Sequence, residues 1–310
     1  MLRPGEKPNR PSLPRYAAVA LLAVASLLCA QESKPPGLTP ADTPPDQLVR
    51  ETVAREVAAA NDASVKHMFR DRKQTPKGTQ TRLYVETNDA MAGMLIAVND
   101  QPLTPQQKQA ERDHLTWLEN NPDQLRKKHA RETEDAEHTL RIVKALPDAF
   151  RYQYAGTEIG SAELGKTGDQ LVRLKFTPNP DYSPPSRVEQ VLSGLEGYLL
   201  IDADARRLAR IDGTLFREVT FGWGIIGHLD KGGHFRVQQA DIGDGSWEIT
   251  QMNLRFTGKI LLLKSLSIVS DEVFTDFARE PDHLTFAQGV DLLLKAEDKS
   301  AQNAATPAAN

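Results

Sequence analysis

Two histidines, His129 and His138, lie among acidic residues in a charged stretch of the sequence, a combination that could bind zinc. A zinc site on a helix takes its ligands from one face, at spacings of three or four residues. His129 and Glu132 have that spacing, but His138 lies nine residues from His129, about 180° away around a helix. No third and fourth ligand lie close by in the sequence. We therefore interpret this stretch as a solvated charged helix and predict no metal ion.

Two further pairs could do chemistry. His228 and His234 flank an Asp-Lys-Gly-Gly turn and could face each other across a hairpin, which would supply half of a metal site. Asp202 and Asp204 resemble the two carboxylates of a glycosidase, which must face each other across a cleft. Aspartates at the end of a strand, however, commonly bond the backbone amides of a turn. We interpret both pairs as structural.

Gly222, Gly224 and Gly227 have the spacing of a dinucleotide-binding motif, which requires a strand before the glycines and a helix after them. Here strand-type sequence and a hairpin turn follow, so we reject this motif. The sequence around Ser246 lacks the glycine spacing of a nucleophile elbow, and there is no P-loop. The sequence therefore predicts no cofactor and no enzymatic activity. The alternative is an exported hydrolase whose site is assembled from distant residues.

Residues 1–30 have the three parts of a secretory signal peptide: a basic start, an apolar run and a small residue at the expected cleavage point, Ala30. The apolar run, residues 17–28, is shorter than the roughly 20 residues that a spanning helix needs. Two alternatives remain, an acylated Cys29 and an uncleaved anchor. Cleavage predicts a periplasmic or secreted protein that is not an integral membrane protein.

The net charge narrows the classes of possible partner, and the cysteine content narrows the possible cross-links and metal sites. The chain carries a net charge of −4, and residues 1–30 hold four basic residues and one acidic residue, which leaves −7 for residues 31–310. An acidic surface argues against nucleic acid as a partner. Cys29 is the only cysteine, so disulfides and cysteine metal sites are excluded from the part after the cleavage point.

The sequence divides into four parts. A proline-rich linker over residues 31–45 follows the signal peptide, and a single β-rich domain covers residues 46–295. A disordered tail is predicted over residues 296–310. Within the domain, residues 104–146 form a charged helical insertion with a break near Asn120, where Asn121 and Pro122 repeat a helix-start signal.

The second half of the domain predicts an antiparallel meander, because five strand-type runs follow one another with short turns between them. These runs cover residues 197–202, 207–221, 235–242, 247–256 and 259–269. A helix precedes the hairpins at residues 46–60, and a short one is expected near 286–295. The sequence therefore predicts an α+β fold, an antiparallel open half-barrel with helices on its concave side.

This order of elements, an export signal, a leading helix and a long meander, resembles the LolA/LolB-like lipoprotein-sorting proteins of the bacterial envelope. The resemblance covers roughly residues 46–275 and rests on topology. It implies a half-open barrel in which helices cover an apolar cavity that holds acyl chains. The charged insertion is larger than such a carrier would have, and aromatic residues make up only 6% of the chain.

The predicted function is that of an exported cell-envelope carrier or binding protein for a lipid or an acylated peptide. Its candidate ligand-binding residues are apolar positions of the meander: Leu215, Val219, Phe221, Trp223, Met252, Leu254, Phe256 and Leu262. The alternative to a ligand cavity is an ordinary core between sheet and helices. A second hypothesis is an interaction module that docks an envelope protein through residues 104–146.

Overall fold

The computed structural model describes residues 43–62, 65–222, 226–260 and 264–305. The predicted signal peptide, most of the linker, Trp223 and Leu262 lie outside these residues. No helix within the described residues is long and apolar enough to cross a membrane.

One large antiparallel sheet organises the chain. Its strand order is β4-β3-β2-β1-β13-β12-β11-β8-β7-β6-β5, with β9 and β10 attached at the side of β12. The strands are β1 (Lys66–Thr75), β2 (Gly78–Val85), β3 (Ala92–Val98), β4 (Gln101–Pro102), β5 (Phe150–Ile159), β6 (Gln170–Pro178), β7 (Leu195–Asp202), β8 (Arg207–Leu215), β9 (Val219–Phe221), β10 (Gly227–Leu229), β11 (His234–Asp241), β12 (Trp247–Ile260) and β13 (Lys264–Glu280).

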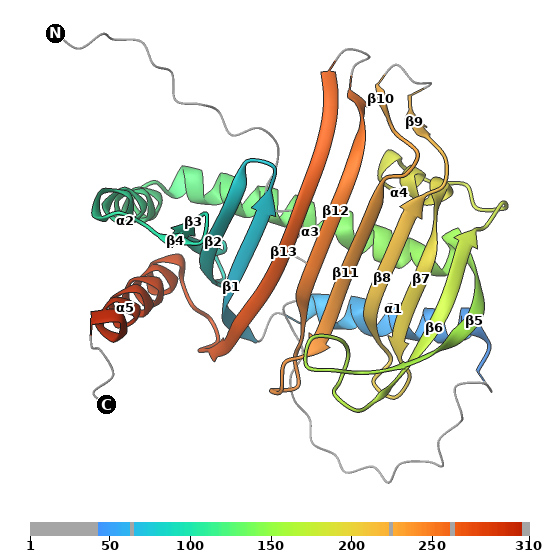
Figure 1. Cartoon of the computed structure of the whole chain (residues 1–310), viewed down its shortest axis with the longest axis horizontal. Helices are drawn as coiled ribbons and strands as arrows, with labels where there is room; N and C mark the ends of the chain where they lie inside the picture. The colour runs from blue at the N-terminus through green and yellow to red at the C-terminus, as the bar shows by residue number, and fades with distance from the viewer. Residues whose placement is uncertain (1–42, 63–64, 223–225, 261–263, 306–310) are drawn as a thin grey trace.

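The sheet is open. Its two edge strands, β4 and β5, do not pair with each other in the part of the chain that the structure describes. Figure 1 shows the long helix α3 (Pro122–Ala149) crossing behind the strands, with α1 (Pro45–Asn61) beside it. The predicted fold class, an open antiparallel half-barrel with helices over one face, is confirmed.

The remaining helices lie toward the two ends of the sheet. α2 (Pro105–Glu119) and α5 (Phe286–Ala305) pack at the β2–β3 end, and α4 (Arg187–Gln190) leads into the short 3₁₀ helix η2 (Val191–Gly194) before β7. A capping box starts α2: Gln107 donates its backbone N–H to Thr104 Oγ1, and Thr104 donates its own to Gln107 Oε1. The predicted break between α2 and α3 falls at Asn120 and Asn121.

Several predicted boundaries are wrong. The run expected over residues 207–221 is two strands, β8 and β9, and the run expected to end at residue 269 continues in β13 to Glu280. A turn was expected at Thr257-Gly258, but β12 continues through both residues to Ile260, because they pair with Ser267 and Leu266 of β13. The last helix was expected to end at residue 295, and disorder was expected after it. Instead α5 continues to Ala305, and only residues 306–310 lie outside the description.

Four apolar clusters hold the layers together among the described residues, the smallest of them around Leu171, Leu200 and Trp247. The largest lies between α1, α3 and strands β5 to β8, and a second joins α2 and α5 to β2 and β3. The third is rich in aromatic rings and includes Phe69, Tyr84 and Phe274. Phe69 lies 5.5 Å from Tyr84 and 5.6 Å from Phe277 between ring centroids.

Candidate functional site: two cavities beneath helix α3

An apolar cavity of about 320 Å³ lies between the helices and the sheet. On the helix side it is lined by Ile142, Val143 and Leu146 of α3. On the sheet side the lining comes from β8, β11 and β12, by Ile211, Phe235, Val237, Ile249, Met252 and Leu254. The layers therefore leave an unfilled apolar space at this point instead of a closed core.

The spacing of these residues explains why they face one another. In β11, Phe235 and Val237 are two residues apart, and so are Met252 and Leu254 in β12, which places each pair on one face of its strand. β11 pairs with β12 so that Val237 lies opposite Met252 and Phe235 opposite Leu254. The sheet thus presents a continuous apolar surface to α3.

The carboxylate at the edge of this cavity is already bound. Glu56 of α1 accepts hydrogen bonds from Arg207 Nε at 2.9 Å, from Arg207 Nη2 at 3.3 Å and from the backbone N–H of Leu208 at 2.8 Å. The Arg207 guanidinium also lies 5.4 Å from the centre of the Trp247 ring. Both charged side chains are buried, and their pairing leaves the lining uncharged where an apolar ligand would lie.

Of the ligand-binding residues predicted from the sequence, some line the apolar cavity and others lie in the core. Met252 and Leu254 line the apolar cavity. Leu215, Val219, Phe221 and Phe256 belong to the core cluster around α1 and α3, and they are not part of the cavity wall. Trp223 and Leu262 lie outside the described residues.

Sequence reasoning missed the helix side of the cavity. Ile142, Val143 and Leu146 lie in the insertion, whose sparse apolar residues, Val143 and Leu146 among them, predict a narrow buried stripe on an otherwise solvated helix. They recur at spacings of one, three and four residues. That spacing is the signal of an apolar face on a helix. In an otherwise charged stretch it indicates which side of α3 covers the sheet.

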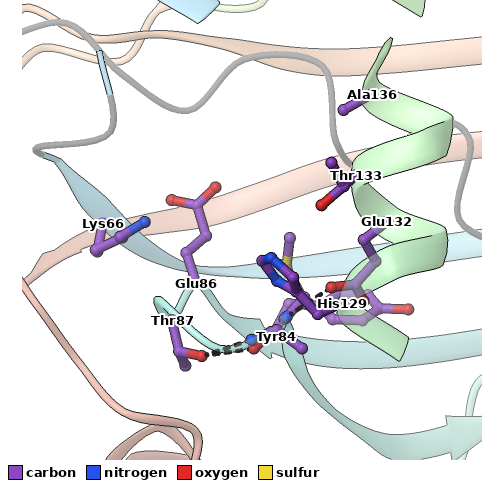
Figure 2. Close-up of a pocket in the computed structure, with 10 residues that line it drawn as sticks. Lys66, Tyr84, Glu86, Thr87, His129, Glu132, Thr133 and Ala136 are labelled. Carbon is purple, nitrogen blue, oxygen red and sulfur yellow. Dashed lines mark hydrogen bonds between the residues drawn. The ribbon is translucent and has the colours of Figure 1, made fainter. Parts of the chain in front are cut away.

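A second, polar cavity of about 210 Å³ lies under the first half of α3 (Figure 2). Lys66 of β1 and Glu86, just after β2, line it from the sheet side, while His129, Glu132 and Ala136 line it from α3. Glu132 accepts the backbone N–H of Met91 at 3.0 Å and forms an ion pair with Lys128. The helix is thereby fixed to the chain between β2 and β3.

Lys66 differs from the other charged residues of this cavity. It is 8% exposed. Among the described residues it has neither a hydrogen bond nor an ion pair for its ammonium group, although its charge acts on the nearby Glu86. Lys66 therefore presents a positive charge to the cavity from a side chain that is otherwise covered.

Next to Lys66, the buried His67 lies among three carboxyl groups. His67 Nε2 lies 2.9 Å from Asp244 Oδ2, and Nδ1 lies 3.4 Å from Glu248 Oε1 and 3.8 Å from Glu86 Oε2. Glu86 also accepts the backbone N–H of His67 at 2.9 Å. This His67 cluster (His67, Glu86, Asp244, Glu248) joins β1, the end of β2 and the β11–β12 hairpin.

The His67 cluster changes the pKa of its members. Burial lowers the pKa of His67, but its contacts with Glu248 and Asp244 outweigh burial and raise the pKa to about 9. Burial raises the pKa of Glu86, and the negative charge of Glu248 raises it further. His67 is therefore positively charged at neutral pH, and the proton-bound form of Glu86 is favoured.

The other candidate residues, the aspartate pair and His228, line neither of the two cavities. Asp202 Oδ1 accepts the backbone N–H groups of Asp204 and Ala205 at 3.1 and 2.8 Å, a turn arrangement. His228 Nε2 lies 3.2 Å from Asp230 Oδ1 and 4.0 Å from Glu218 Oε2. These three ligand atoms lie within 4.8 Å of one another, close enough to hold a divalent cation.

The remaining histidines do not form joint sites. His234 contacts Thr214 Oγ1 at 3.2 Å on β8, so it does not share its partners with His228. On α3, His129 lines the polar cavity and His138 lines the apolar one. The nine-residue spacing thus places them at different cavities.

Comparisons with known proteins do not identify a family for this chain. No family model matches the chain, and no curated protein matches it. A solved structure from Vibrio parahaemolyticus, described as an outer membrane lipoprotein-sorting protein domain, aligns with 80% of this chain and 97% of that chain, with 10% identity and a TM-score of 0.28. That structure belongs, by its description, to the class of proteins that the order of elements in this sequence resembles. At this TM-score the two backbones superpose poorly, so the likeness carries no argument about function.

Proposed function

We propose that this protein is a non-enzymatic binding or carrier protein of the cell envelope that holds the apolar chain of a lipid or an acylated peptide. The observation that supports the proposal is the apolar cavity of about 320 Å³ between α3 and strands β8, β11 and β12. An engineered apolar cavity of about 150 Å³ is already large enough to stay dry and bind benzene. Each methylene group buried there would contribute about 0.8 kcal/mol.

The location of the protein in the periplasm or outside the cell belongs to the same proposal. It rests on the signal-peptide pattern of residues 1–30. A lipid chain must be shielded from water in such a compartment, and a cavity covered by a helix provides this shielding.

The two other hypotheses account less well for the structure. An interaction module with a free helical arm requires a filled sheet, whereas α3 covers a cavity and packs against α1 and β5. A hydrolase requires available carboxyl groups. The polar cavity does bring Glu86, Glu132 and His129 together, but protein donors already bind Glu132 and Glu86.

A dye-displacement titration tests the proposal. N-phenyl-1-naphthylamine, which fluoresces in apolar surroundings, is expected to bind the protein at one saturable site, and oleic acid is expected to displace it completely. This follows because the cavity walls are apolar and the one carboxylate at its edge is paired. Failure of the dye to bind, or binding that oleic acid does not reverse, would count against a lipid cavity.

A further inference from the structure

Lys66 is the charged residue of the polar cavity that has no hydrogen bond or ion pair among the described residues. Lys66 is 8% exposed, and no described residue forms a hydrogen bond or an ion pair with its ammonium group. The Lys66 ammonium group is not fully buried, so it can meet a ligand in the open space of the cavity. A negatively charged group in the cavity would form a charge-assisted hydrogen bond with it.

The charged groups around Lys66 favour the binding of an anion in the polar cavity. The charge of Lys66 acts on Glu86, whose raised pKa favours the neutral form, and that form can donate a hydrogen bond. His67 contacts Glu86 and is positively charged. Glu248 approaches the same ring nitrogen of His67, Nδ1, as Glu86 does, and Asp244 approaches Nε2. On the α3 side, Glu132 is already neutralised by Lys128. Figure 2 shows Lys66 and Glu86 on the same side of the cavity.

The polar and apolar cavities lie along one stripe of α3. Glu132 and Ala136 line the polar cavity, and Thr139, Val143 and Leu146 line the apolar one. These positions are four, three, four and three residues apart, which places them on one side of the helix. Only three residues separate Ala136 from Thr139, a rise of about 4.5 Å.

The third apolar cluster contributes wall residues to both cavities. Its members include Tyr84 and Met91, which line the polar cavity, and Ile249 and Met252, which line the apolar cavity. From Glu132 to Leu146 the helix rises about 21 Å. A bilayer core of about 30 Å holds two layers of acyl chains, so one chain extends about 15 Å. The stripe is therefore long enough for one chain and its headgroup.

We propose that the polar cavity binds the anionic headgroup, a carboxylate or a phosphate, of the amphiphile whose chain occupies the apolar cavity, with Lys66 as its counter-charge. This inference rests on the proposed function for the position of the chain. It adds a ligand class: long-chain amphiphiles with a negatively charged end, held in one orientation along α3.

Three ligands with the same eighteen-carbon chain test the inference. Oleic acid carries a carboxylate, oleoyl lysophosphatidic acid carries a phosphate, and oleyl alcohol carries no charge. At pH 7 the unaltered protein is expected to bind at least one of the two acids about tenfold more tightly than the alcohol, because a buried charge-assisted hydrogen bond has that effect. The comparison of the two acids identifies the headgroup.

Variants of Lys66 test whether the tighter binding of an acid than of oleyl alcohol arises in the polar cavity. Lys66→Gln is expected to weaken binding of the preferred acid about tenfold and to leave oleyl alcohol unchanged, while Lys66→Arg keeps most of the preference. Lys77→Gln removes an exposed lysine from the β1–β2 turn and serves as the matched control.

The outcomes separate this inference from the proposed function. If the alcohol binds as tightly as both acids, or if Lys66→Gln weakens all three ligands equally, the headgroup site is contradicted and the apolar cavity stands. If none of the three ligands binds, both proposals fail. If Lys66→Gln does not fold, the relative affinities of the unaltered protein for the two acids and for oleyl alcohol still test the headgroup site.

Discussion

Replacing Val143 with tryptophan is expected to reduce the affinity of the protein for oleic acid at least about tenfold, a loss of about 1.4 kcal/mol or more. Val143 is half-buried on α3, and its side chain lines the apolar cavity opposite β11 and β12. An indole group at this position would occupy the space that an acyl chain needs. The loss of two methylene contacts would already account for this change in affinity.

A tryptophan elsewhere on α3 provides the control. Glu134 is exposed and lines neither of the two cavities, so Glu134→Trp adds the same indole to the same helix without filling the cavity. It should bind oleic acid as the unaltered protein does. Circular dichroism melting of both variants shows whether the fold is retained. A folded Val143→Trp variant with unchanged affinity would show that the ligand does not occupy this cavity.

Replacing His67 with glutamine is expected to lower the free energy of unfolding by about 3 kcal/mol at pH 6. The change removes the positive charge that Asp244, Glu86 and Glu248 surround, and leaves the carboxyl groups of Glu86 and Glu248 buried without it. Urea unfolding of the variant and of the unaltered protein measures the difference. His114→Gln changes an exposed histidine on α2 and is the control.

The pH dependence of that difference follows from the raised pKa of His67. A histidine whose pKa rises from 6.5 to about 9 on folding contributes stability that is fully present below pH 6.5 and is lost as the pH rises through 9. Glu86 and Glu248 act in the same direction, because burial raises the pKa of both. The unaltered protein should lose stability between pH 6.5 and 9, and His67→Gln should lose less. Equal slopes for the two proteins would contradict the role of His67.

The sequence predicts the elements of this fold better than their contacts. Alternation in β12 correctly placed Met252 and Leu254 on one face, and the proline at residue 122 located the start of α3. Alternation does not show which faces leave a space between them. Leu215 and Val219 have the same pattern, yet they are packed within the core cluster.

The polar cavity could not be predicted from the sequence. Lys66, Glu86 and His129 come from three separate segments, and each has an ordinary charged or polar setting in its own segment. Only the pairing of β1 with β2 and the position of α3 across them bring these residues together. The burial that raises the pKa of Glu86 is a property of this packing.

Native mass spectrometry of the protein, purified from a bacterial periplasm without detergent, tests the carrier proposal most directly. The proposal predicts an added mass of lipid size that disappears on organic extraction and that is missing from the Val143→Trp variant. A protein with the mass of the bare chain, which also takes up no added oleic acid, phospholipid or acylated peptide, would contradict it.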